Sequence, residues 1–172
     1  MAEAPPPTRV FVYGTLKRGF PNHPLLAACG SPFVGAASTA SPASLVIGPY
    51  SVPFLLPTPP SSPSAGRVVS GEIYAPSPAA LAELDGTHIG VYERRPITVV
   101  ADGSGELVEA EAYFAHPSYA EALWRRCGGE AAEIEVYTAD HAARYVPIGE
   151  RASGAAGLID AIHMFLATAP DK

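Results

Sequence analysis

The stretch Arg9-Val10-Phe11-Val12-Tyr13-Gly14-Thr15-Leu16-Lys17 decides the first element of the fold. Its first five residues are mostly apolar and favour β structure, which predicts a strand buried on both faces. Gly14 has no side chain, so the backbone can turn sharply there and approach a ligand closely. Successive N–H groups in such a turn can bind an anion, and a carboxylate fits as well as a phosphate. The alternative is an ordinary glycine turn at the end of a strand.

A nucleotide-binding P-loop does not fit this segment. Gly14 and Gly19 stand five residues apart, but Phe20-Pro21 follows where a P-loop needs Lys and then Ser or Thr. The net charge is −6 at pH 7, and the basic residues form only isolated pairs, Lys17-Arg18 and Arg94-Arg95. We interpret both pairs as solvated surface, with the border of a site for an acidic small molecule as the alternative. No nucleic-acid partner is expected.

The size and composition indicate one domain in a reducing compartment. A chain of 172 residues can bury one sound hydrophobic core. Cys29 and Cys127 are far apart and lie outside any CxxC pattern, and the five histidines never stand at metal-ligand spacing, so no metal is expected. Residues 1–8 should form a disordered tail, and the apolar run 157–169 is too short and too polar for a bilayer. We expect a cytoplasmic monomer that does not bind membranes.

Runs of β-favouring residues recur along the first two thirds of the chain. They cover residues 10–13, 33–36, 44–47, 50–56, 67–74, 95–100 and 107–114. Because turn residues separate these runs and helical segments are short, the pattern predicts an α+β fold, a mixed β-barrel or strongly curved sheet with helices outside. The Pro- and Ser-rich segment 57–66 should form an exposed insert, and residues 102–105 a hairpin turn.

Three short helices are expected. Ser77-Pro78 has the form of an N-cap followed by Pro at the first helical position, and Gly86 is placed to end that helix. Within it, Leu81 and Leu84 share one face, which leaves Glu83 and Asp85 on other faces or at the exit turn. The second helix should cover residues 119–126. The third, residues 158–166, has an apolar stripe that should pack against the barrel.

The segment 10–19, continued by Pro21-Asn22-His23, resembles the opening of the gamma-glutamylcyclotransferase-like superfamily, specifically its gamma-glutamylamine cyclotransferase and plant AIG2-like branch. Later segments with similar spacing are Val52-Pro53-Phe54-Leu55-Leu56, Val69-Ser70-Gly71-Glu72-Ile73-Tyr74, Leu81-Ala82-Glu83-Leu84-Asp85-Gly86 and Val91-Tyr92-Glu93-Arg94-Arg95-Pro96. The resemblance covers residues 9–116 and implies the same barrel. Residues 117–172 are then expected to form a C-terminal helical extension packed on the same domain.

The resemblance implies a cyclotransferase, which performs an intramolecular acyl transfer. The α-amine of a γ-glutamyl compound attacks its own γ-carbonyl, which gives 5-oxoproline and a free amine without a cofactor. Such a reaction needs a group that moves protons and an anchor for the α-carboxylate. Tyr13, Gly14, Thr15 and Leu16 match the family's substrate-binding loop, in which backbone amides contribute more than side chains.

The resemblance also suggests the proton-transfer group. Asp85 aligns with the family's acid/base glutamate, so this chain has a side chain one methylene shorter there. Glu83 is the full-length alternative, although in a helix it would point elsewhere, and a helix-terminating Asp-Gly turn is the structural interpretation of Asp85. Tyr92 and Tyr113 are candidate pocket walls, with core packing as the alternative role.

Two other functions stay open on the sequence. A non-catalytic module could bind a γ-glutamyl ligand without turnover if the change from Glu to Asp abolishes proton transfer. An amide hydrolase or acyltransferase could use the same pocket, although no Ser-His-Asp order, G-x-S-x-G elbow or Cys-His pair supports covalent hydrolysis. The particular γ-glutamyl substrate is not specified by these motifs.

Overall fold

The fold was analysed in a computed structural model, which describes residues 8–20, 23–28, 30–48, 51–56, 68–87, 92–127, 133–145, 162 and 166. The strands of this described part are β1 (Val10–Val12), β2 (Phe33–Thr39), β3 (Leu45–Ile47), β4 (Pro53–Leu55), β5 (Ser70–Tyr74), β6 (Tyr92–Ala101) and β7 (Leu107–Ala115). The helices are α1 (His23–Ala28), α2 (Pro78–Thr87), α3 (Ala120–Cys127) and α4 (Ala139–Ala143).

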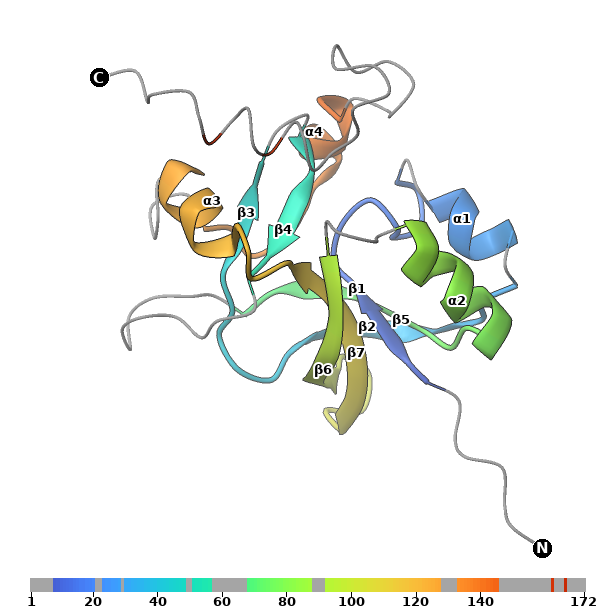
Figure 1. The fold of residues 1–172 in the computed structure, drawn as a ribbon. Helices are drawn as coiled ribbons and strands as arrows, with labels where there is room; N and C mark the ends of the chain where they lie inside the picture. Colours follow the sequence, from blue (N-terminus) through green and yellow to red (C-terminus); the bar gives the residue numbers. More distant parts are fainter. Residues whose placement is uncertain are drawn as a thin grey trace, which may run out of the picture.

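Five of the strands close into a barrel (Figure 1). Strand β1 pairs antiparallel with β5 and parallel with β7, and the order β1-β5-β2-β6-β7 returns to β1. The N–H of Glu111 on β7 donates to the carbonyl of Arg9 just before β1, at 2.8 Å, which closes the circle. Strands β4 and β3 extend the sheet from β7, with Leu55 opposite Phe114. The predicted mixed barrel is confirmed.

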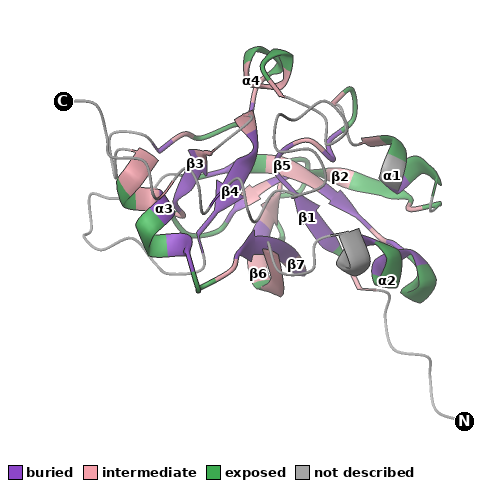
Figure 2. Ribbon diagram, turned by 45° about the horizontal axis from the view of Figure 1, so that its top comes forward, coloured by how far each residue is buried: buried purple, intermediate pink, exposed green. Residues whose placement is uncertain are grey.

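Strand β1 is buried on both faces, as its composition predicts (Figure 2). Phe11 points into the barrel, where it packs with Ile73 and other buried residues. Val10 and Val12 lie on the opposite face in a second cluster, which includes side chains of α1 and α2. The two helices lie side by side on this side of the barrel and expose their outer faces to solvent (Figures 1 and 2).

The other helices lie away from α1 and α2. Helix α3 covers β3 and β4 on the far side of the barrel, where Leu123 is buried with Phe54 (Figure 1). Ile162 is also fully buried in this cluster, and Leu166 packs against it. Both residues are helical, but the rest of the helix expected over 158–166 lies outside the described residues.

The sequence expectations for the helices were partly right. Helix α3 matches the expected 119–126 within one residue at each end. Helix α2 begins as predicted, with the N–H of Ala80 donating to Oγ of Ser77 at 3.1 Å, but it continues to Thr87 and does not stop at Gly86. Helices α1 and α4 were not predicted. Residues 1–7 of the expected N-terminal tail (residues 1–8) and the whole Pro- and Ser-rich insert lie outside the described residues.

Candidate functional site

The loop after β1 is built from consecutive turns. The N–H of Lys17 donates to the carbonyl of Gly14 at 3.1 Å, that of Phe20 to Lys17 at 3.0 Å, and that of His23 to Phe20 at 3.1 Å. Gly19, with φ of 82°, supplies the left-handed conformation that the second turn uses. These three hydrogen bonds lie between the end of β1 and the first residue of α1.

The side chain of Tyr13 anchors the start of the loop inside the barrel. Tyr13 is 6% exposed, and its hydroxyl donates to the carbonyl of Tyr113 on β7 and accepts from the N–H of Leu55 on β4 at 3.4 Å. Burial raises the pKa of this phenol well above its usual value, so it stays neutral. Tyr13 therefore fixes the loop to two strands, and its side chain faces the core.

Of the other predicted loop residues, Gly14 and Leu16 are buried and Thr15 is half-buried. The ring of Pro53, the first residue of β4, lies directly against Gly14. Gly14 does not have a left-handed backbone, so its lack of a side chain serves this contact. The sequence analysis did not predict this contact, because Gly14 and Pro53 are far apart in the sequence.

The far end of the loop is attached to β5. The N–H of Arg18 donates to a carboxylate oxygen of Glu72 at 2.9 Å, and Nε of Arg18 lies 3.8 Å from the second oxygen. The guanidinium also stacks 3.8 Å over the ring of Phe33. Arg18 is exposed, as expected, whereas Lys17 is only 7% exposed. The interpretation of Lys17 as solvated surface was therefore wrong.

Helix α2 brings the predicted proton-transfer segment next to this loop. Leu81 and Leu84 are buried in the same cluster as Leu16, so this face of the helix packs on the loop and on β1. Glu83, between them, is exposed. Asp85 lies in the helical backbone, one turn after Leu81, and its side chain lies outside the described part of the structure.

The two predicted tyrosines both lie near this junction. Tyr113 is buried in the cluster that contains Leu16 and Leu84. Tyr92 is half-buried at the start of β6, where its ring stacks on Phe54 at 5.4 Å and its hydroxyl donates to the carbonyl of Pro53 at 2.9 Å. Tyr92 thus links the segment that touches Gly14 to the strand that follows α2.

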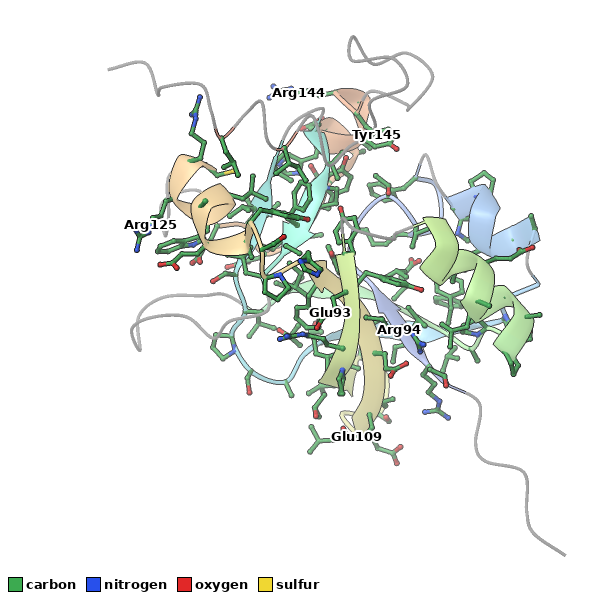
Figure 3. The ribbon with its side chains drawn as sticks, viewed as in Figure 1. Glu93, Arg94, Glu109, Arg125, Arg144 and Tyr145 are labelled. Carbon is green, nitrogen blue, oxygen red and sulfur yellow. The ribbon has the colours of Figure 1, made fainter. Side chains whose placement is uncertain are left out.

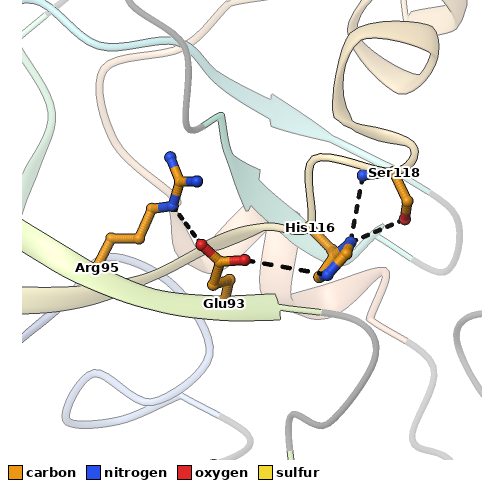
Figure 4. Close-up of polar contacts among 4 residues, drawn as sticks. All are labelled: Glu93, Arg95, His116 and Ser118. Atoms are coloured by element: carbon orange, nitrogen blue, oxygen red, sulfur yellow. Dashed lines mark hydrogen bonds and ion pairs between the residues drawn. The ribbon is translucent and has the colours of Figure 1, made fainter.

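A polar network lies beside Tyr92, on the surface of β6 and β7 (Figures 3 and 4). Glu93 accepts from Nε of Arg95 at 2.6 Å and lies 4.0 Å from Nε2 of His116. The N–H of Ser118 donates to Nδ1 of His116 at 3.2 Å, so a neutral ring carries its proton on Nε2, toward Glu93. The charged side chains are about two-fifths exposed, so this surface network contributes little to the stability of the fold.

The described residues contain no group of His, Cys, Asp or Glu side chains that could hold a metal ion. Among the same residues, no helix is long and apolar enough to cross a membrane. Cys127 is a free thiol whose pKa burial raises to about 11, which makes it a poor nucleophile at neutral pH.

Comparison with known proteins agrees with the barrel and the loop. The family model described as gamma-glutamyl cyclotransferase, AIG2-like, matches residues 10–143, which extends past residue 116. The crystal structure of a mouse AIG2-like protein has a TM-score of 0.68 at 29% identity and covers 85% of this chain and 99% of the mouse chain. The fold is thus that of gamma-glutamylcyclotransferase-like proteins.

Two curated relatives have names that refer to gamma-glutamyl cyclotransferase activity. A protein of Arabidopsis thaliana with the provisional name gamma-glutamylcyclotransferase is 40% identical over 95% of this chain and 94% of its own length. The human gamma-glutamylaminecyclotransferase is 49% identical over 80 residues, which are 44% of this chain and 50% of the human protein. The chain belongs to the AIG2-like gamma-glutamyl cyclotransferase family.

Proposed function

We propose that the protein is a gamma-glutamyl cyclotransferase that converts a γ-glutamyl amine or γ-glutamyl amino acid into 5-oxoproline and a free amine. The family match and the relatives named for this activity support the reaction class. The observation that supports the site is the packing of α2 on the loop, because Leu16, Leu81 and Leu84 share one buried cluster. This packing brings the loop next to the helix that contains Asp85.

The loop would hold the substrate at its α-carboxylate. The backbone amides at Gly14, Thr15 and Leu16 are the proposed donors, since the side chain of Tyr13 is committed to the carbonyl of Tyr113. Anchoring one end of the γ-glutamyl group allows it to fold back, so that the α-nitrogen meets the γ-carbon. Holding the substrate in this folded-back conformation lowers the barrier, because the reacting atoms already lie in the geometry of attack.

Asp85 is the proposed proton-transfer group. Its carboxylate takes a proton from the α-ammonium, and the freed amine attacks the γ-carbonyl carbon. When the bond to the leaving nitrogen breaks, the carboxyl group returns its proton to that nitrogen. The α-nitrogen still carries two protons after the attack, and it passes one of them through the same carboxylate to the departing amine, so that 5-oxoproline and an ammonium product are released. Asp85 lies one helical turn after Leu81 in the backbone of α2 and aligns with the acid/base position of the family, whereas the side chain of Glu83 is exposed. This difference favours Asp85.

The decisive experiment is a product assay with a panel of γ-glutamyl-ε-lysine, γ-glutamyl amino acids and glutathione. Mass spectrometry distinguishes 5-oxoproline from glutamate, and calorimetry measures binding. Release of 5-oxoproline supports the proposal. Release of glutamate would indicate a hydrolase, and binding without turnover would indicate a ligand-binding module; either result would overturn it.

A cytoplasmic location and a monomeric state are also proposed. The free thiol of Cys127 suits a reducing compartment. Microscopy of a fluorescent fusion tests the location, and light scattering after size-exclusion chromatography tests the monomer.

A further inference from the structure

Lys17 is a buried cation at the end of the turn that contains the proposed substrate-binding amides. Its Nζ donates to the carbonyl oxygen of Tyr137 at 2.7 Å and lies 4.5 Å from the centre of the Phe20 ring. Burial lowers the pKa of this ammonium, while the nearby Glu72 raises it. Burying an ammonium group costs free energy unless hydrogen bonds replace those it made with water. The carbonyl that accepts from Lys17 belongs to a residue 120 positions away in the sequence, so the bond ties two distant segments together.

Tyr137 continues the connection to a second segment of the site. Its side chain is fully buried, and its hydroxyl donates to the carbonyl of Ser51 at 2.7 Å. The ring also stacks on His141 at 5.4 Å. Tyr137 therefore receives Lys17 at its backbone and holds Ser51 with its side chain.

Ser51 has an unusual backbone conformation that these contacts maintain. Its φ of 60° lies in the left-handed region, which a residue with a side chain seldom adopts. The Oγ of Ser51 donates to the carbonyl of His141 at 2.7 Å, while its own carbonyl accepts from Tyr137. Such conformations persist only where the surroundings hold them, and here the Tyr137 hydroxyl and the His141 carbonyl both hold Ser51.

The contacts form a closed circuit around the loop. Ser51 directs the chain to Pro53, whose ring lies against Gly14. The carbonyl of Gly14 accepts from the N–H of Lys17, and Nζ of Lys17 returns to Tyr137. Gly14 and Lys17 bracket Thr15 and Leu16, so the circuit fixes both ends of the turn whose amides would hold the substrate.

We propose that Lys17 and Tyr137 are positioning residues, through which the segment 137–141 outside the barrel sets the geometry of the substrate loop. The inference rests on the proposed function of that loop. One of the three N–H donors of the Lys17 ammonium is used by the carbonyl of Tyr137, and this bond is the one through which Lys17 acts on the loop. The residues act through Gly14 and Pro53, and the amides between them bind the α-carboxylate.

The test compares Lys17→Met, Tyr137→Phe and the double variant with the control Arg125→Met. Met keeps most of the apolar stem of Lys17, and Phe removes one hydroxyl. Arg125 makes an exposed ion pair with Glu121 on α3, far from the loop (Figure 3). We expect KM for the γ-glutamyl substrate to rise about tenfold in each single variant, with kcat changing less, because a hydrogen bond that orders a binding loop is lost.

If Lys17 and Tyr137 only stabilised the fold, the activity of each variant would fall in proportion to its folded fraction. The circuit also predicts that the double variant is no more than about as impaired as the worse single variant, because both changes break one connection. Unchanged KM in both folded single variants, or a fall in activity that only follows the folded fraction in circular dichroism, would overturn the proposal. If Lys17→Met does not fold, Tyr137→Phe decides alone.

Hydrogen exchange gives a readout that does not need turnover. We expect faster exchange in peptides covering residues 14–20 and 51–56 of both variants, and no change in the β6–β7 hairpin or in Arg125→Met. Unchanged exchange in both peptides would contradict the circuit. If the wild-type protein released no 5-oxoproline, the proposed function would fail, whereas the exchange experiment would still test the linkage between Lys17, Tyr137 and Ser51.

Discussion

The ring of Pro53 occupies the space where a side chain on Gly14 would lie: a Cβ on Gly14 would stand 2.3 Å from Cγ of Pro53. Contacts below 3.0 Å are essentially never made by real Cβ atoms, so one of the two residues would have to move. The glycine in the YGTLK motif is therefore required by packing between the loop and β4. Its backbone is not left-handed, so turn geometry alone does not require it.

Gly14→Ala should lower the free energy of unfolding by about 1–3 kcal/mol, the usual cost of overpacking a well-packed site. Adding Pro53→Ala should recover much of that loss, because the atom that clashes is removed. Urea unfolding of the two single variants and the double variant measures both effects. Gly103→Ala is the control, since a Cβ there meets no atom within 4 Å.

A result in which Gly14→Ala is as stable as the wild type and binds a γ-glutamyl ligand normally would show that the loop can yield at this point. It would also weaken the proposed circuit from Pro53 to Lys17. A stable Gly14→Ala with lost binding would instead indicate that the glycine serves ligand approach, as its position after a strand first suggested.

Gly71 on β5 should tolerate a side chain less well than Gly14. A Cβ there would lie 2.3 Å from the carbonyl oxygen of Val12 and 2.8 Å from the ring of Phe11, and the oxygen is held in the β1–β5 pairing. We expect Gly71→Ala to cost about 3 kcal/mol or more. Gly35→Ala on the paired strand β2 is the control, since no atom lies within 4 Å of its Cβ. Equal melting temperatures for the two variants would contradict this packing.

The elements that local signals specify were predicted well. The apolar run before Gly14 gave β1, because a strand buried on both faces needs no alternation. Ser77-Pro78 gave the start of α2, because the N-cap bond to Ala80 is made within four residues. Helix α4 was missed because its capping box pairs Thr138 with His141, whereas the sequence signature has Glu or Gln at that position.

The site was predictable only in its local part. The loop and α2 could be proposed from segments that match the family, but the reason for each residue lies in a distant partner. The ring of Pro53 leaves no room for a side chain at Gly14, and the hydroxyl of Tyr13 donates to the carbonyl of Tyr113. The buried ammonium of Lys17 donates to the carbonyl of Tyr137. A carbonyl oxygen is present at every residue, so no sequence pattern distinguishes the one that receives the ammonium.

The protein should lose stability above about pH 10, where unfolded tyrosines ionise. Burial raises the pKa of Tyr13, Tyr74 and Tyr119, and it raises that of Tyr137 to about 12. Between the ordinary value and the raised one, the unfolded chain binds fewer protons than the folded chain. Each such phenol therefore lowers the free energy of unfolding by about 1.4 kcal/mol per pH unit in that interval.

Lys17 has the opposite sign, because burial lowers the pKa of its ammonium and the unfolded chain binds that proton more tightly. This contribution of Lys17 ends near the ordinary pKa of lysine, 10.5, whereas the phenols act above about pH 10, so the net trend from there upward is a loss. Urea unfolding from about pH 9 to about pH 11.5 measures the slope. Tyr137→Phe should make the slope shallower by the share of one phenol. A stability that stays level over this range would contradict the burial of these tyrosines.

The proposed acid/base role of Asp85 gives the last prediction. Asp85→Asn keeps the size of the side chain but cannot accept the proton of the α-ammonium, so kcat for 5-oxoproline release should fall by about 10² to 10⁴. Binding of the γ-glutamyl compound, measured by calorimetry, should change little. Glu83→Gln is the matched control on the exposed side of the same helix and should keep its activity.

Asp85→Glu tests whether the shorter side chain limits the enzyme. If the carboxylate of Asp85 falls short of the substrate nitrogen, the added methylene should raise kcat, because a displacement of about 1 Å can cost about 10² in rate. If the loop and α2 are already adjusted to Asp, the longer side chain should leave kcat unchanged or lower it. An active Asp85→Asn together with an inactive Glu83→Gln would move the proton-transfer role to Glu83. Each variant loses one carboxylate, and only the loss of the carboxylate that transfers the proton should abolish turnover.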